Sequence, residues 1–189
     1  MENIQTYIGY AAGIFGLIPF VMIAISMKKG ETKPNLAGWI IYTVAMAMIV
    51  LSSIVIGAWQ AVWLAMAYIV GQSLVISLSF RTGYFAFSRF DYIALSISFL
   101  SVVLWISTND PIYALVLNVL VDAMGTFAIL HKLYLHSGTE STKAWTMASF
   151  VALLNIFAIT SFDVSHALYP IYLVFANALI AALSFRKNK

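Results

Sequence analysis

The sequence predicts an all-α integral membrane protein with seven transmembrane helices, and three observations support that prediction. The chain is 62% hydrophobic and only 9% charged over 189 residues, whereas soluble domains contain about a quarter charged residues. Its apolar residues gather into long runs that are bounded by charges and turn residues. The short alternating segments of a membrane β-barrel are missing from the sequence. In lipid, the backbone of such runs must satisfy its own hydrogen bonds by forming helices.

Seven apolar runs can be marked along the chain, and most approach the ~20 residues that span a hydrocarbon core. They are Tyr7–Met27, Leu36–Ile56, Trp59–Phe80, Tyr92–Ser107, Ile112–Leu133, Trp145–Phe162 and Ala167–Phe185. The fourth run is the shortest. The length suits a single membrane domain, 1–189, and residues 1–5 lack the basic region of a cleavable signal peptide, so none is expected. Because there is no cysteine, disulfides and thiolate metal sites are excluded.

The basic residues predict the orientation of the chain in the membrane. With seven spans, all ten fall on one side: Lys28, Lys29, Lys33, Arg81, Arg89, Lys132, Lys143, Arg186, Lys187 and Lys189. The other side carries only the acidic residues Glu2, Asp110 and Asp163. By the positive-inside rule, the amino terminus is expected outside and the carboxy terminus in the cytoplasm of a plasma or inner membrane. This placement explains the basic composition without nucleic acid as a partner.

Three matches at similar offsets indicate an internal repeat. The segment 74–81 matches 179–186 with an offset of 186 − 81 = 105. Trp39 and Trp145 open the second and sixth runs with an offset of 106, and Gly16 and Gly125 are separated by 109. We therefore expect two parallel three-helix repeats, at about 6–81 and 111–186, joined by a linker helix at about 91–107.

A 3+1+3 layout with parallel repeats resembles the SWEET and PQ-loop transporter superfamily. These proteins carry Pro-Gln in the first helix, followed about nine residues later by a basic residue. Here Pro19-Phe20 occupies that position, with Lys28 nine residues after the proline. In the second repeat the equivalent pair is Ala128-Ile129. The resemblance implies a seven-helix bundle that moves a small polar solute by alternating access.

Two amides are the first candidates for binding that solute. Gln72 and Asn177 lie near the middle of the third helix of each repeat, and their offset, 177 − 72, is again 105. Similar transporters place an amide at about this point, where the pair contacts the substrate. An amide offers donors and acceptors without a charge, so two facing amides can hold a small polar solute. The alternative is an interhelical hydrogen bond worth roughly 0.6–2 kcal/mol.

Asp122 is the one acidic side chain deep inside an apolar run. It lies 11 residues past Pro111, about 16 Å into a ~30 Å core. Asn118 and Gly125 lie about one turn to either side of it on the same helix face. A carboxylate at that depth is costly and usually functional. We expect it to bind a cation, carry a proton or accept a hydrogen bond from the solute; the alternative is a protonated structural aspartate.

The equivalent positions of the first repeat carry no polar group. Subtracting 109 from Asp122 and Asn118 gives Gly13 and Gly9, which form a small-residue ridge with Gly16. Such a ridge favours close packing of helices. The two repeats have therefore diverged.

The remaining candidates are secondary. Asn155, Tyr68 and Tyr172 are expected to line the cavity, although Asn155 equally suits a structural hydrogen bond. Pro19 and Pro170 are expected to act as hinges, because proline removes a backbone donor from a helix. Trp39, Trp105 and Trp145 are interpreted as interfacial belt residues. The histidines His131, His136 and His166 lie near the membrane edges without ligand spacing, so no metal is expected.

Two functions follow from these residues. The first is transport of a small neutral polar or cationic solute, with proton coupling through Asp122 as an option. The second is a non-transporting receptor or lipid-handling protein of the same shape. No nucleophile–base pair, cofactor motif or catalytic residue appears, so an enzyme is not expected. The expected partners are the solute and the lipid bilayer, and formation of a homo-oligomer is left open.

Overall fold

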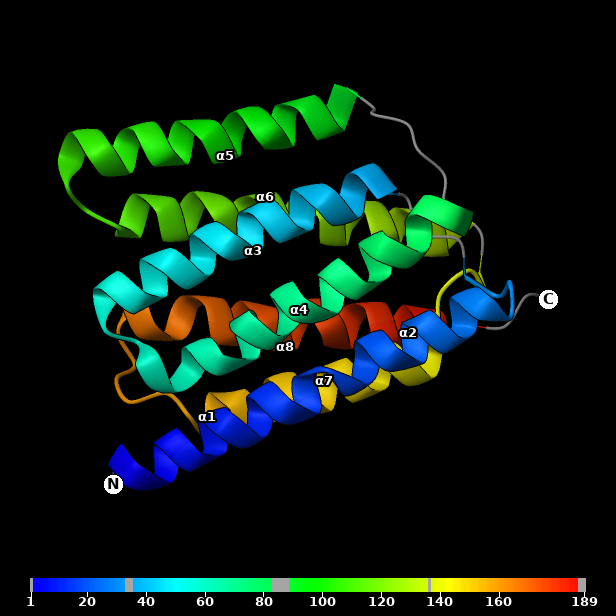
Figure 1. Cartoon of the computed structure of the whole chain (residues 1–189), viewed down its shortest axis with the longest axis horizontal. Helices are drawn as coiled ribbons and strands as arrows, with labels where there is room; N and C mark the ends of the chain where they lie inside the picture. The colour runs from blue at the N-terminus through cyan, green and yellow to red at the C-terminus, as the bar shows by residue number, and fades with distance from the viewer. Residues whose placement is uncertain (1, 33–35, 83–88, 136, 187–189) are drawn as a thin grey trace.

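The described residues of the computed structural model, 2–32, 36–82, 89–135 and 137–186, form helices connected by short turns (Figure 1). The helices are α1 (Glu2–Gly16), α2 (Ile18–Lys28), α3 (Leu36–Ile56), α4 (Trp59–Thr82), α5 (Arg89–Thr108), α6 (Ile112–Leu135), α7 (Thr142–Ile156) and α8 (Val164–Ser184). No strand occurs among these residues. The all-helical prediction is confirmed for this part of the chain.

Six helices of the described chain are long and apolar enough to cross a membrane. They correspond to Ile4–Lys28, which joins α1 and α2, and to α3, α4, α5, α6 and α8. A multi-pass membrane protein is therefore supported.

The sixth and fourth segments differ from their predicted lengths. The run Trp145–Phe162 was expected to be one helix, but α7 has 15 residues and ends at Ile156, which is about 22 Å long. In contrast, α5 has 20 residues, although its run is the shortest in the sequence. The chain after α7 turns through i→i−3 hydrogen bonds, and the Gln5 side chain in α1 donates to the Ile159 carbonyl at 2.9 Å. The Gln5 side chain thus provides a hydrogen bond to a carbonyl group in a segment that hydropathy alone assigns to a helix.

The first apolar run, Tyr7–Met27, is interrupted. The helix breaks at Leu17 between α1 and α2. Pro19 lies in the first turn of α2. Because proline has no N–H, it cannot donate the helical hydrogen bond to the carbonyl group one turn earlier. Both Pro19 and Pro170 are expected to loosen their helices. The chain breaks next to Pro19, whereas Pro170 lies inside α8 without interrupting it.

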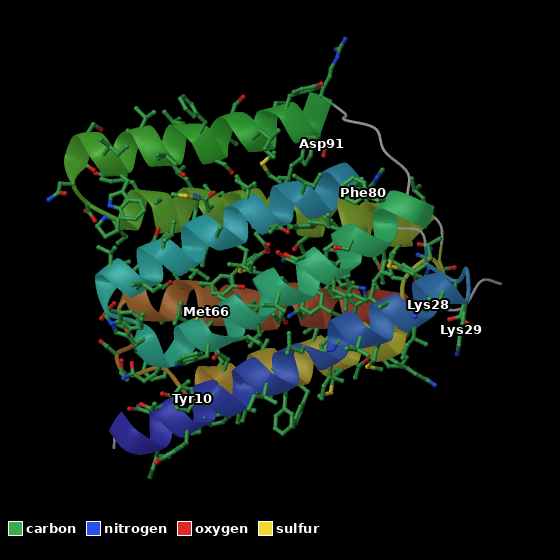
Figure 2. The ribbon with its side chains drawn as sticks, in the orientation of Figure 1. Tyr10, Lys28, Lys29, Met66, Phe80 and Asp91 are labelled. Atoms are coloured by element: carbon green, nitrogen blue, oxygen red, sulfur yellow. The ribbon has the colours of Figure 1, made fainter. Side chains whose placement is uncertain are left out.

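The two ends of the bundle differ in chemistry. The last residues of α2, α4, α6 and α8 lie at one end, opposite the start of α1 (Figure 1). Figure 2 shows Lys28, Lys29, Phe80 and Asp91 toward that end and Tyr10 toward the other. We call the end with Lys28 and Lys29 the basic end. The other end is called the acidic end, because Asp110 and Asp163 lie there, just before the first residues of α6 and α8. At the acidic end, Asp163 caps α8, and hydrogen bonds from Ser161 and His166 hold its pKa below the usual range.

Helix neighbours follow a pattern that repeats. In the first half, α4 packs against α1 and α3; in the second half, α8 packs against α6 and α7. Between the halves, α3 packs against α6, and α7 packs against α1 and α2. Helix α5 lies against α6 and α3 at the side of the bundle (Figure 1).

Glycines allow α1 to approach α4 closely, as the small-residue ridge predicts. A Cβ added to Gly9 would lie 1.9 Å from the backbone oxygen of Gln60, and one added to Gly13 would lie 3.1 Å from the Trp63 oxygen. A Cβ on Gly16 would lie 2.5 Å from a methyl group of Leu64. The contact at Gly9 is with backbone, which has little room to move.

We expect Gly9→Ala to destabilise the fold by about 1–3 kcal/mol, because overpacking a close helix contact forces the backbones apart. Gly38→Ala is the matched control, since a Cβ there would meet nothing within 4 Å. Thermal unfolding of the two variants in detergent measures the difference. Equal midpoints would show that the α1–α4 contact can widen without cost.

Candidate functional site

A cavity lies in the middle of the bundle, between the two halves of the chain. Its volume is about 60 Å³. It is lined by Pro19, Phe20, Ile23, Trp39, Tyr42, Met46, Tyr68, Gln72, Asp122, Thr126, Ile129, Ala144, Trp145, Ala148, Leu173, Ala176 and Asn177. These residues come from α2, α3, α4, α6, α7 and α8. We call it the central cavity.

Five of the predicted site residues line it: the solute-binding candidates Tyr68, Gln72, Asp122 and Asn177, and the hinge candidate Pro19. Asn177 Nδ2 donates to the Tyr68 hydroxyl at 3.3 Å, which links the two halves across the cavity. Gln72 is 4% exposed, and its Oε1 has no hydrogen-bond partner among the described residues. A buried carbonyl oxygen without a partner is costly, so Gln72 is equipped to accept a hydrogen bond from a bound molecule.

Asp122 is held on its oxygen Oδ2 by a hydrogen bond of 2.5 Å from the Tyr172 hydroxyl. The same hydroxyl lies 3.0 Å from Thr126 Oγ1. Asp122 is 6% exposed. None of the described residues that line the cavity is a lysine, arginine or histidine. The carboxylate is therefore held by a neutral donor, the Tyr172 hydroxyl.

Aromatic rings form another part of the wall. Phe20 lies against Tyr68 with ring centroids 5.0 Å apart and against Trp39 with centroids 6.2 Å apart. Trp39 lies 6.2 Å from Tyr42. All three pairs are edge-to-face, with interplanar angles of 81°, 74° and 63° respectively. We call Phe20, Trp39, Tyr42 and Tyr68 the aromatic wall.

Two tryptophans were wrongly interpreted as belt residues. Trp39 and Trp145 line the central cavity, and Trp145 Nε1 donates to Glu140 Oε2 at 3.1 Å. Hydropathy places both near a membrane edge but does not tell which way a ring points. Their equal spacing in the repeat was the available signal. Trp105 lies on α5, outside the cavity.

A second cavity lies at the basic end and shares walls with the first. Ile23, Trp39, Tyr42 and Ile129 line both, and we call these four residues the inner gate. We call the second cavity the inner vestibule, and its volume is about 220 Å³. Its outer rim includes Thr32, Phe90, Asp91 and Glu140, which lie at the ends of helices or in turns at the basic end.

Toward the acidic end, the interior of the bundle is packed. Ile49, Val62, Leu64, Leu115 and Val151 are each at most 2% exposed, and we call these five residues the packed cluster. They belong to a larger core that includes Met46 of the cavity lining, whose Sδ accepts a hydrogen bond from the Tyr169 hydroxyl at 3.1 Å. The central cavity is therefore next to a vestibule on one side and to packed side chains on the other.

The other predicted site residues lie outside the cavity lining. Asn118 donates to Ser101 Oγ in α5 at 2.7 Å and to the Ala114 carbonyl. Asn155 donates to the Ala61 carbonyl in α4 at 3.2 Å. These two amides join helices. This corrects the placement of Asn118 in the cavity, and for Asn155 it agrees with the structural hydrogen bond that the sequence left as an alternative. Tyr172 contacts the site through its hydrogen bonds with Asp122 and Thr126, and Pro170 is buried in α8.

Most of the lining comes in pairs at the repeat offsets. The offset of 105 joins Gln72 to Asn177 and Tyr68 to Leu173; the offset of 106 joins Trp39 to Trp145 and Tyr42 to Ala148; the offset of 109 joins Phe20 to Ile129. In every pair except Gln72 and Asn177, the residue from the first half is aromatic. The second half contributes one aromatic residue, Trp145, and the polar residues Asp122 and Thr126.

Comparison of the chain with protein-family models, with curated proteins and with solved structures finds no match. Its function must therefore be inferred from the site. The cavity combines a carboxylate, two amides and aromatic rings in the middle of an apolar bundle. That combination is suited to holding a small molecule.

Proposed function

We propose that this protein is a membrane transporter that moves a small neutral polar or cationic solute by alternating access. The observation that carries the proposal is the position of the central cavity. Its polar groups lie at the middle of the apolar helices, between two halves of the chain, with a vestibule at one end and a packed cluster at the other. Solute sites of secondary transporters lie near the midplane at the interface of two repeats.

The helix neighbours support two equivalent three-helix repeats with α5 as the linker. Exchanging α1/α2, α3 and α4 for α6, α7 and α8 leaves the list of main contacts unchanged: each third helix packs on its first and second, and α3–α6 exchanges with α7–α1/α2. The pairing of cavity residues at three sequence offsets points the same way. This is the arrangement that the resemblance to the SWEET and PQ-loop superfamily implies.

Alternating access then requires the inner gate and the packed cluster to open in turn. The two repeats meet through α3–α6 and α7–α1/α2, so a rocking motion at these contacts would open one end while closing the other. The break at Leu17, followed by Pro19, lies next to the central cavity and gives the first helix a place to bend. We propose Pro19 as a hinge and assign no motion to Pro170.

We place the basic end in the cytoplasm and the start of the chain outside. The positive-inside rule supports this orientation. In this orientation the inner vestibule faces the cytoplasm, as it would in an inward-facing state of a transporter. Tags at residues 1 and 189 should therefore report opposite sides of the membrane, with the latter cytoplasmic.

Uptake into proteoliposomes tests the proposed function. We expect the protein to concentrate or equilibrate at least one compound from a labelled panel of sugars, amino acids, nucleosides and organic cations. Gln72→Ala and Asn177→Ala should each lower uptake by roughly 5- to 100-fold, because each removes a hydrogen-bonding group worth about 1–3 kcal/mol when buried. Gln60→Ala on α4 is the matched control, since Gln60 does not line the cavity.

The alternative function gives a different result in the same experiment. A receptor or lipid-handling protein would bind a compound from the panel, with weaker binding by the Gln72 and Asn177 variants, but no labelled compound would enter the liposomes. Binding without uptake would thus reject transport and keep the cavity as a binding site.

A further inference from the structure

The two walls of the central cavity differ in chemistry. The first repeat contributes the aromatic wall, Phe20, Trp39, Tyr42 and Tyr68, whereas the second repeat contributes Asp122, Thr126 and a single aromatic ring, that of Trp145. Neighbouring rings of the aromatic wall meet edge-to-face, at interplanar angles of 74°, 81° and 63°. The faces of such rings attract cations that come within about 6 Å of the ring centroid.

The charges around the cavities have one sign. Asp122 is in the central cavity, and Asp91 and Glu140 are in the inner vestibule. No lysine, arginine or histidine lines either cavity among the described residues. This contrasts with the surrounding end of the bundle, where Lys28, Lys29 and Arg186 lie. Within the central cavity, the carboxylate of Asp122 favours a cation over an anion.

The size of the central cavity restricts the occupant. Its volume of about 60 Å³ is enough for roughly four water molecules. A trimethylated or tetramethylated ammonium group, with about five non-hydrogen atoms, has a similar size. A hexose is more than twice as large and fits only if the walls move apart.

We propose that the central cavity binds the head group of a small alkylated ammonium ion, with its methyl groups against the aromatic wall and its charge toward Asp122. The inference rests on the proposed function, of which it names the solute class. Gln72 Oε1, which lacks a partner, accepts a hydrogen bond from a hydroxyl or amide on the rest of the ion. The inner vestibule, next to the inner gate, accommodates that remainder.

Binding by the unmodified protein tests the proposal. We would titrate detergent-purified protein with choline and with dimethylbutanol, the uncharged analogue in which carbon replaces the quaternary nitrogen, and follow tryptophan fluorescence and heat. Choline should bind at least tenfold more tightly than its analogue. Equal affinities would show that the cavity selects shape rather than charge and would reject the proposal. Absence of binding by choline and tetramethylammonium alike would also reject it.

A pair of tryptophan variants locates the site. Trp39→Leu should weaken choline binding at least fivefold, because leucine keeps apolar volume but removes the ring face. Trp59→Leu is the control, since Trp59 lies exposed at the start of α4 and lines neither cavity. Equal binding by both variants would place the cation elsewhere. Should Trp39→Leu fail to fold, the comparison of choline with dimethylbutanol still decides the proposal.

The outcomes also separate this proposal from transport. Choline that binds but does not enter proteoliposomes would reject the proposed function and leave the cation site intact. Uptake of a neutral solute together with equal affinities for choline and dimethylbutanol would reject the cation site and keep the proposed transport function.

Discussion

Asp122→Asn is expected to abolish accumulation driven by a proton gradient, while the fold is retained. Aspartate and asparagine have nearly the same shape, and the asparagine oxygen can still accept the hydrogen bond that the Tyr172 hydroxyl donates to Oδ2. Asparagine, however, can neither release a proton nor neutralise a cation. A carboxylate in the middle of a membrane bundle is costly and usually has a function, so we expect the variant to lose coupling completely.

The affinity of the variant separates two kinds of solute. For a neutral solute, binding should survive the substitution, since Gln72 and Asn177 remain. For a cationic solute, removal of the buried carboxylate should weaken binding by about 2 kcal/mol or more, which is roughly 30-fold. Uptake by proteoliposomes with and without an imposed pH gradient, together with titration of the solute, measures both quantities.

Asp110→Asn is the matched control for this experiment. Asp110 is exposed at the acidic end, where its Oδ1 accepts a hydrogen bond from the Ile112 N–H at 3.0 Å, and asparagine can accept the same bond. This variant should behave like the parent protein. If Asp122→Asn also accumulates solute as the parent does, Asp122 is a structural residue that bonds Tyr172, and the coupling role is wrong.

Composition was sufficient to predict the class of fold, since few soluble chains combine long apolar runs with so little charge. The boundaries were less predictable. Hydropathy treats residues 157–162 as part of the sixth span, but helix α7 ends at Ile156 and Gln5 supplies a hydrogen bond to the chain that follows. A donor 154 residues away in sequence leaves no local signal. Tertiary contacts decide such ends.

Among the candidate site residues, the repeat offset was the more informative signal. It paired Gln72 with Asn177, and both line the central cavity. The presence of an amide in an apolar run was not enough for Asn118 and Asn155, which bond to neighbouring helices instead. A polar group needs a partner at any buried position, so burial alone cannot separate a cavity residue from one that joins two helices. The same offset, applied to Trp39 and Trp145, would have moved both from the belt to the site.

Gly125→Ala is expected to lower uptake at least tenfold by displacing the inner gate. A Cβ at Gly125 would lie 2.1 Å from Cζ and from the hydroxyl of Tyr42. Both atoms are at the far end of a side chain, so the ring moves before the backbone does. Tyr42 separates the central cavity from the inner vestibule, and its displacement changes the passage between them. The fold should tolerate the change, because alanine favours a helix by about 1 kcal/mol over glycine.

A second substitution tests whether Tyr42 is the cause. Tyr42→Ala removes the ring that the new methyl group would meet, so the double variant Gly125→Ala, Tyr42→Ala should transport better than Gly125→Ala alone. Tyr42→Phe in the same background should give no rescue, since Cζ is retained and only the hydroxyl is lost. Thermal unfolding in detergent accompanies the uptake measurements. An uptake defect that Tyr42→Ala leaves unchanged, with an unfolding midpoint far below that of the parent, would mean that Gly125 serves the packing of α6 against α3 and that Tyr42 does not gate the cavity.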